Sequence, residues 1–236
     1  LDEILKGVRL LLQEDGLFVI EVSYLMDVVE KILFDTIYHE HVAYHALTPL
    51  IAFFQRHGLN IIGAQRVSSH GGSIRVIATP STGPRANESE TTVDQLIQAE
   101  AERGLLSPEV FEKMADRIFK LRDQVIKKLN AFRADGLSVA GFGAPAKATT
   151  LMYHFGLGPD EIEFIIDDSP LKQNLYSPGL HVPVVDNSIL ESDQRPDVLV
   201  VLAWNFADAI VEKNWAFAQC GGTFLIPLPE VKVIQA

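Results

Sequence analysis

The sequence predicts an α/β protein in which two α/β regions are joined by a helical segment. In the first 86 residues, a helix, a strand and two further helices precede a closely spaced pair of strands. Residues 87–134 carry apolar residues at helical spacing, and from residue 135 to 236 strands alternate regularly with helices. Such alternation is typical of a parallel sheet with helices packed on its faces. We therefore expect three parts, residues 1–86, 87–134 and 135–236.

The first part, residues 1–86, is predicted to be the second half of a doubly wound sheet that ends in an antiparallel hairpin. Its expected elements are helices over 1–14, 24–33 and 48–57, and strands over 17–22, 59–67 and 73–79. Thr48 is the expected N-cap of the third helix, because a threonine before a helix can accept a hydrogen bond from its first turn. The last two strands are joined by a short glycine-containing connection, which favours antiparallel pairing. This part contains no glycine-rich turn between a strand and a helix, so any loop that cradles a nucleotide-like cofactor there is expected before Leu1.

The second part, residues 87–134, is predicted to be a helical connector. A proline-, glycine- and serine-containing linker precedes it, and Ser107-Pro108 is a typical helix start. Apolar residues then recur every three or four positions up to Phe132, which indicates one long helix packed against a neighbouring domain or, alternatively, a short coiled coil. We expect the charged residues on its other face to be solvated.

The third part, residues 135–236, is predicted to be a Rossmann-like domain with a parallel sheet. Strands are expected over 138–142, 162–166, 198–202 and 223–226, with helices over 144–155 and 205–219. The first strand leads into GFGAPAK (141–147), a G-x-G-x-x-A turn that opens a helix, and the second strand ends at Asp167. Glycines allow the backbone to approach a phosphate, the helix N-terminus presents free N–H groups, and Lys147 adds a positive charge. A diphosphate site is expected here, with a tight structural turn as the alternative.

The composition restricts the classes of function. The chain has 236 residues, 47% of them hydrophobic, so it can bury one large or two modest cores. Cys220 is its single cysteine, which excludes intrachain disulfides and is in keeping with a reducing cytosol. A net charge of −11 argues against nucleic-acid or anionic-membrane binding, and no apolar run is long enough to cross a bilayer. Because the chain starts at Leu1 inside an expected helix, we expect it to be a fragment. We also expect a monomer or a small homo-oligomer.

The most informative stretch is FDTIYHEH (34–41), which places Tyr38, His39, Glu40 and His41 in succession. Imidazole titrates near neutrality, and a carboxylate beside it can raise its basicity, so the stretch suits general acid–base chemistry. A tyrosine hydroxyl can donate to a developing oxyanion. Three alternatives remain: a solvated polar turn, histidines packed in a core, and a metal site formed by the H-x-H-x3-H pattern that ends at His45. That pattern lacks the spacing of the common helical zinc motif and has no nearby cysteine, so we expect no metal.

Four motifs in this order carry a family resemblance: FDTIYHEH (34–41), HGGSIR (70–75), GFGAPAK (141–147) and IIDDSPLK (165–172). Together they resemble the S-adenosylmethionine-dependent sugar C-methyltransferases of the TcaB9 and NovU type, over nearly the whole chain. In that family a zinc-binding domain and a methyltransferase domain precede a Rossmann-like C-terminal domain. This chain has neither the zinc cysteines nor the glycine-rich S-adenosylmethionine loop, so it resembles only the later half of the methyltransferase domain and the C-terminal domain. If it is a fragment, we expect it to be inactive alone.

The resemblance implies methyl transfer to an α-carbon of a nucleotide-linked keto-deoxysugar, such as a dTDP-4-keto sugar, in the cytoplasm. By the family motif His41 is the base that forms an enolate, Glu40 and Tyr38 flank it, and Tyr38 or His39 stabilises the enolate oxygen. Physical reasoning adds candidates for substrate binding on the hairpin, namely His70, Ser73 and Arg75. It also adds candidates for holding the diphosphate and ribose on the C-terminal domain, namely Gly141, Gly143, Ala144, Lys147, Asp167, Lys172 and Tyr176.

Two other classes of function remain open. An NAD-dependent oxidoreductase would explain the G-x-G-x-x-A turn, with Asp167 on the ribose, but Pro145 and Lys147 are unusual in that fingerprint. A non-catalytic module that binds a sugar nucleotide but no S-adenosylmethionine is the third possibility. Binding of dTDP or of NADH distinguishes the methyltransferase and oxidoreductase interpretations.

Overall fold

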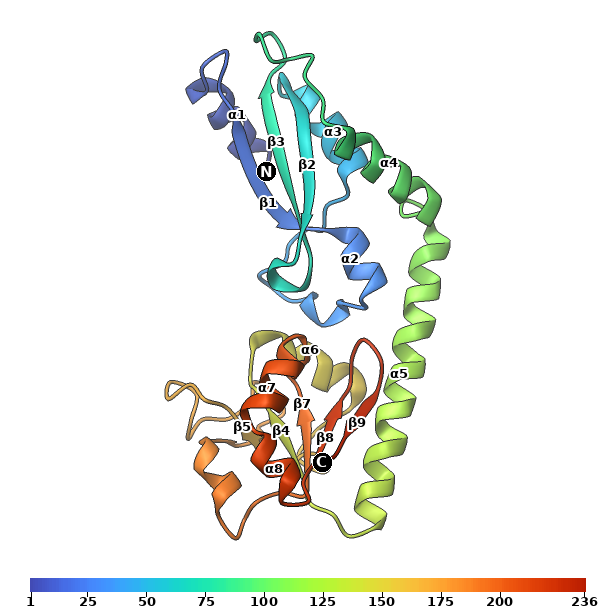
Figure 1. The fold of residues 1–236 in the computed structure, drawn as a ribbon, viewed down its shortest axis with the longest axis vertical. Coiled ribbons are helices and arrows are strands. Elements are labelled where there is room, and N and C mark those ends of the chain that lie inside the picture. Colours follow the sequence, from blue (N-terminus) through green and yellow to red (C-terminus); the bar gives the residue numbers. More distant parts are fainter. The chain divides into compact units, whose positions relative to one another are not determined.

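The chain folds into two compact α/β units, as the computed structural model in Figure 1 shows. The structure describes residues 1–236, except for the side chain of His70. Unit 1 comprises Leu1–Leu33 and Val42–Met114, and unit 2 comprises Phe34–His41 and Ala115–Ala236. The predicted α/β class is confirmed. The units divide the chain differently from the three predicted parts, because the 34–41 segment belongs to unit 2 and the long helix α5 contributes to both units.

Unit 1 is a three-stranded antiparallel sheet with helices. Its elements are α1 (Asp2–Leu11), β1 (Phe18–Ser23), α2 (Leu25–Glu30), α3 (Leu47–Arg56), β2 (Leu59–Val67), β3 (Ser73–Pro80), α4 (Thr91–Arg103) and the first residues of α5 (Pro108–Ala134). A short 3₁₀ helix, η2 (Ser69–Gly71), connects β2 to β3. The strand order is β1-β3-β2, and β3 pairs antiparallel with both neighbours, which confirms the predicted hairpin. Its core includes Tyr24, Phe54 and Leu59.

All three predicted helices of unit 1 differ from the structure at their ends, and the one expected over 1–14 already ends at Leu11. The helix expected over 24–33 is only α2, because the backbone of Ile32 adopts φ 55, a left-handed conformation that interrupts a helix. Helix α3 begins at Leu47 with Ala46 as its N-cap, so the prediction that Thr48 is the cap was wrong. The first turn of α3 is instead capped by the carboxylate of Glu100 from α4, which accepts from the N–H groups of Leu47 and Thr48. A tertiary contact therefore replaces the local cap that the sequence suggested.

Unit 2 is built on a six-stranded sheet with the order β6-β5-β4-β7-β8-β9. Its strands are β4 (Val139–Phe142), β5 (Ile165–Ile166), β6 (Val184–Val185), β7 (Val198–Val201), β8 (Thr223–Ile226) and β9 (Lys232–Ile234). Its helices are the remainder of α5, α6 (Ala146–Phe155), α7 (Ala207–Lys213), α8 (Trp215–Gln219) and the 3₁₀ helices η1 (Phe34–Thr36), η3 (Asn187–Glu191) and η4 (Trp204–Phe206). All neighbouring strands are parallel except β8 and β9.

The strand order of unit 2 reverses at β4. The chain passes from β4 through α6 to β5 on one side, and later returns to β7 on the other side of β4. In open α/β sheets this reversal leaves a crevice at the carboxyl ends of the two central strands, where ligands usually bind. The GFGAPAK segment contains the last two residues of β4 and leads into α6, and Trp204 follows β7. Both segments therefore lie at the carboxyl ends of the central strands.

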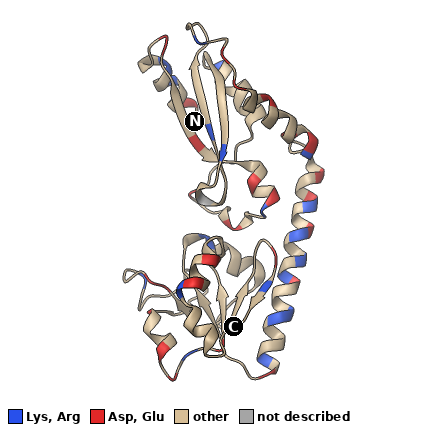
Figure 2. Ribbon diagram, in the orientation of Figure 1, with Lys and Arg blue, Asp and Glu red and all other residues tan. Residues whose placement is uncertain are grey.

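Helix α5 is a single helix of 27 residues. Its buried positions include Met114, Ile118, Leu121, Val125 and Leu129, which are the apolar residues that the sequence places on one face. Lys and Arg side chains recur along the helix, and Figure 2 shows them as blue bands. The helix is therefore amphipathic, as its spacing predicts.

Candidate functional site

The Tyr38–His41 stretch forms a turn directly after η1, within unit 2. The Tyr38 ring makes edge contacts with both imidazoles, at 5.7 Å from the His39 centroid and 5.2 Å from that of His41. The Tyr38 hydroxyl donates to Glu40 Oε2 at 3.3 Å, and the backbone N–H of His41 donates to the backbone carbonyl of Tyr38 at 3.0 Å. His39 and Glu40 are exposed, whereas Tyr38 and His41 are half-buried. The four predicted catalytic side chains therefore form one cluster, with tyrosine at its centre.

His45, the third member of the H-x-H-x3-H pattern, belongs to unit 1, where its backbone bridges to Tyr24. Burial lowers the pKa of the half-buried His45 imidazole. Across the described part of the chain, no group of three or more His, Cys, Asp or Glu side chains is arranged to hold a metal ion. Among the described residues, no helix is long and apolar enough to span a membrane.

Residue Asp35, just before the cluster, is fully buried in unit 2. Its Oδ2 atom lies 2.6 Å from Trp204 Nε1, which donates to it, and 3.5 Å from Lys147 Nζ. The Lys147 ammonium lies 4.5 Å from the centroid of the Trp204 ring. The sequence reasoning did not select Asp35 or Trp204. The position of Trp204 after the central strand β7, at the strand-order reversal, is the signal that could have found it.

The two glycines of the GFGAPAK segment, Gly141 and Gly143, lie close to neighbouring side chains. Gly143 has φ +88, and a Cβ atom there would lie 2.6 Å from the Cβ of Ala203. A Cβ on Gly141 would lie 2.8 Å from Leu202 Cδ1. Both positions therefore favour glycine because neighbouring side chains pack closely at the carboxyl end of β4. This is what a tight structural turn requires, with or without a phosphate bound to it.

Asp167 is engaged by the chain itself. Its carboxylate accepts from the N–H of Ala144 at 2.7 Å, from the N–H of Ser169 at 2.9 Å and from Lys172 Nζ at 3.1 Å. Burial acts to raise the pKa of Asp167, but the hydrogen bonds outweigh it and the pKa lies below its usual value. Asp167 therefore fastens the glycine turn to the loop after β5.

Three of the predicted residues line one pocket of about 240 Å³ beside the turn. Ala144 borders it on the side of α6, and Lys172 and Tyr176 border it on the loop after β5. Most of the other lining side chains are apolar, among them Met152 and Ile165. This composition, an apolar wall with a few polar groups, is typical of small-molecule sites.

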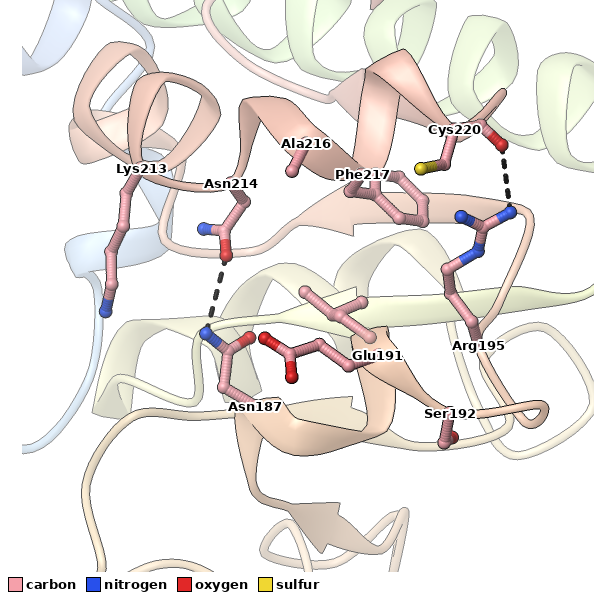
Figure 3. Close-up of a pocket in the computed structure, with 10 residues that line it drawn as sticks. Asn187, Glu191, Ser192, Arg195, Lys213, Asn214, Ala216, Phe217 and Cys220 are labelled. Atoms are coloured by element: carbon pink, nitrogen blue, oxygen red, sulfur yellow. Dashed lines mark hydrogen bonds between the residues drawn. The ribbon is translucent and has the colours of Figure 1, made fainter.

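A second pocket, of about 420 Å³, lies between η3 and helices α7 and α8. Figure 3 shows Asn187 and Asn214 joined across it, and Arg195 bonded to the Cys220 carbonyl. Its lysine, Lys213, pairs with Asp168 at 2.7 Å. None of the predicted site residues lines this pocket, and its two cations already have partners.

The predicted hairpin residues belong to unit 1. The Arg75 guanidinium donates from two of its nitrogens to Glu21 on the neighbouring strand, at 3.2 and 2.9 Å. Glu21 also accepts from Ser69. Ser73 is buried and donates to the Ser69 carbonyl, so it stabilises the connection between β2 and β3. The side chain of His70 lies outside the described part of the chain.

Comparisons with known proteins agree with this arrangement of motifs. A family model described as the C-methyltransferase C-terminal domain matches residues 68–229. The chain is 37% identical over 234 residues to the C-methyltransferase NovU of Streptomyces niveus, across 99% of this chain and 55% of that protein. It therefore belongs to the C-methyltransferase family, and within that family it is of the NovU type, which confirms the resemblance. The chain spans about half the length of this curated relative.

Proposed function

We propose that this chain is the part of an S-adenosylmethionine-dependent sugar C-methyltransferase that binds the nucleotide-linked keto-deoxysugar and removes its α-proton. The observation that carries the proposal is the cluster of Tyr38, His39, Glu40 and His41 in a chain that belongs to the C-methyltransferase family. A C-methyltransferase has to make carbon nucleophilic, and general base catalysis by a histidine is suited to that task at neutral pH.

In the proposed reaction, His41 takes the proton from the carbon next to the sugar ketone. The electron pair left on that carbon delocalises to the ketone oxygen and forms an enolate, whose charge Tyr38 or His39 stabilises by donating a hydrogen bond. The Tyr38 hydroxyl donates to Glu40 in the present arrangement, so we expect it to turn to the substrate oxygen when substrate binds. Holding the groups in this order contributes through proximity and orientation.

The methyl group would come from S-adenosylmethionine, which the family name implies. In unit 1, β1 passes into α2 through Tyr24, which is fully buried, and no glycine-rich turn follows the strand. The junction between β1 and α2 therefore supplies no cofactor loop, and we derive no step for the cofactor from unit 1.

For the nucleotide part of the substrate we propose the 240 Å³ pocket beside the glycine turn. Lys172 would supply a cation by exchanging its partner Asp167, 3.1 Å away, for a phosphate. Tyr176 supplies an exposed aromatic ring, and the apolar wall a surface for a flat base. Contributions by Arg75, Ser73, His70 and the glycine turn to binding of the substrate remain predictions. Arg75 would have to exchange its carboxylate partner Glu21 for a phosphate.

The first test is calorimetric titration of this chain with dTDP, with NADH in parallel. We expect a dissociation constant on the order of micromolar, or about −8 kcal/mol, for dTDP and no heat from NADH. Lys172→Met should weaken dTDP binding by about 1–3 kcal/mol, because it removes a charged hydrogen-bond donor. Lys213→Met, which removes a lysine of the second pocket, is the matched control. Binding of NADH without dTDP would favour the oxidoreductase instead.

The second test addresses the base. In the enzyme with its cofactor, His41→Asn should reduce methyl transfer by at least about 100-fold, the typical contribution of a general base. Binding of dTDP should stay unchanged in this variant. Methyl transfer at the wild-type rate would remove His41 from the mechanism.

A further inference from the structure

At the strand-order reversal of unit 2, an acidic side chain of the protein itself contacts the residues that follow the two central strands. Folds of this kind bind a ligand at the carboxyl ends of the two central strands, often an anion on the helix that follows the first of them. Here Lys147 lies in the first turn of α6, after β4, and Trp204 follows β7. Both contact the buried carboxylate of Asp35. The acidic group beside Lys147 is therefore a side chain of the chain itself, where related folds would bind the anion of a ligand.

The three side chains are tightly coupled to each other. The Lys147 side chain is only 14% exposed, and that of Asp35 is 0% exposed. Burial raises the pKa of Asp35 and lowers that of Lys147, while each charge counteracts the shift of the other. Asp35 Oδ1 is buried and has no hydrogen-bond partner among the described residues. Loss of Lys147 or of the indole N–H would therefore leave a buried carboxylate poorly compensated, which is strongly unfavourable.

Contacts on either side of Asp35 attach the same segment to α6. The Phe34 ring stacks on Phe155 with centroids 5.6 Å apart, and the Thr150 hydroxyl donates to the Ile37 carbonyl at 3.4 Å. Ile37 is followed at once by Tyr38, the first residue of the catalytic cluster. The backbone that presents the cluster is thus fixed to unit 2 immediately before it.

We propose that Asp35, Lys147 and Trp204 form a clamp that positions the 38–41 cluster on unit 2. In this role the lysine of the glycine turn binds a carboxylate of the chain instead of a diphosphate of the substrate. The three are positioning residues, because they act on the reaction through the backbone that carries Tyr38 and His41. The inference goes beyond the proposed function, since it holds whatever sugar or nucleotide binds.

The test uses hydrogen exchange of the chain at the amides of 36–41, compared with the amides of β4 and β7. The variants are Asp35→Asn, Lys147→Met, Trp204→Phe, which removes the indole N–H but keeps an aromatic ring, and the double variant Asp35→Asn with Lys147→Met. Lys213→Met is the control, because it removes a lysine of the same unit whose carboxylate partner is exposed. In the enzyme with its cofactor, kcat and KM are measured for the same set.

We expect exchange at 36–41 to accelerate about tenfold or more in each single charge variant, with β4 and β7 changing less than about twofold. Trp204→Phe should give a smaller acceleration, and the double variant should exchange more slowly than either single charge variant, because no charge is left unpaired. Lys147→Arg should restore the wild-type rate. The kcat value should fall at least about tenfold at unchanged KM, as for loss of a group that acts only on the transition state.

Two results would overturn the clamp. Equal acceleration at 36–41, β4 and β7 would mean that the residues only stabilise the unit. Unchanged exchange at 36–41 together with weaker dTDP binding by Lys147→Met would mean that Lys147 contacts the diphosphate. Absence of dTDP binding in the wild type would contradict the proposed function but leaves the exchange result fully informative.

Discussion

Glu100 is a charged side chain that stabilises the interior of unit 1. It is 2% exposed, and its carboxylate accepts from Tyr24 Oη, from the N–H groups of Leu47 and Thr48, and from the Thr48 hydroxyl. A negative charge at the N-terminus of α3 is favourable, because the first N–H groups of a helix have no partner within it. One carboxylate thus joins α4, α3 and the residue that precedes α2.

Replacing Glu100 should therefore be costly. Glu100→Gln puts an N–H₂ group where an acceptor is needed, and we expect a loss of about 2–4 kcal/mol in the free energy of unfolding. Glu102→Gln on the same helix, where the side chain is exposed, should change stability by less than about 0.5 kcal/mol. Urea unfolding followed by circular dichroism measures both. Equal effects would show that the charge of α4 matters more than this hydrogen-bond network.

Asp167 makes the stability of unit 2 depend on pH. Hydrogen bonds from Ala144, Ser169 and Lys172 overcome the effect of burial and lower its pKa in the folded state. The carboxylate therefore contributes stability above the pKa of the unfolded chain, about 3.9, and this contribution is lost as the pH falls through the lower folded pKa. In Asp167→Asn this part of the pH dependence should be absent. The difference in melting temperature between wild type and variant should be largest at neutral pH and should shrink below about pH 4.

The turn between β4 and α6 shows how a glycine can be needed for two reasons at once. Gly143 combines a left-handed φ of +88 with the close approach of Ala203, whereas Gly156, after α6, has φ +70 and no heavy atom within 4 Å of the place that a Cβ would take. Gly156→Ala should therefore cost only backbone strain, about 1–2 kcal/mol. Gly143→Ala adds a steric clash with Ala203 and should cost about 1–3 kcal/mol more. Thermal unfolding of the two variants separates these effects, and equal costs would mean that Ala203 can move away.

Elements with a strong local pattern could be predicted from the sequence, and those defined by distant contacts could not. The hairpin of β2 and β3 and the alternation of β4, α6 and β7 were predicted from residue type and spacing. The structure confirms that these elements exist. Strands β6 and β9 have two and three residues and exist through their neighbours, so no local pattern indicates them. In the candidate site, the cluster at 38–41 was visible as a motif. The partners Asp35 and Trp204 are 169 residues apart, and only the fold brings them together.

The two units each have a core of their own, and this property of the whole chain can be tested. Leu59 of β2 is 0% exposed in unit 1, and Leu129 of α5 is 1% exposed in unit 2. Each Leu→Ala substitution should cost about 3 kcal/mol, because it removes buried apolar surface and leaves a cavity. If the units unfold separately, Leu59→Ala accelerates hydrogen exchange only in residues 1–33 and 42–114, and Leu129→Ala only in 34–41 and 115–236.

The same measurement distinguishes the two units from the three parts predicted from the sequence. The segment at 34–41 is decisive, because the sequence assigns it to the first part whereas its contacts with Lys147, Thr150 and Trp204 place it in unit 2. Its amides should respond to Leu129→Ala and stay protected in Leu59→Ala. Faster exchange of 34–41 together with β1 and β2 in Leu59→Ala would support the predicted first part, residues 1–86. Exchange of 87–134 that is independent of both units would support a separate connector. Acceleration of the whole chain by either substitution would instead show a single cooperative unit.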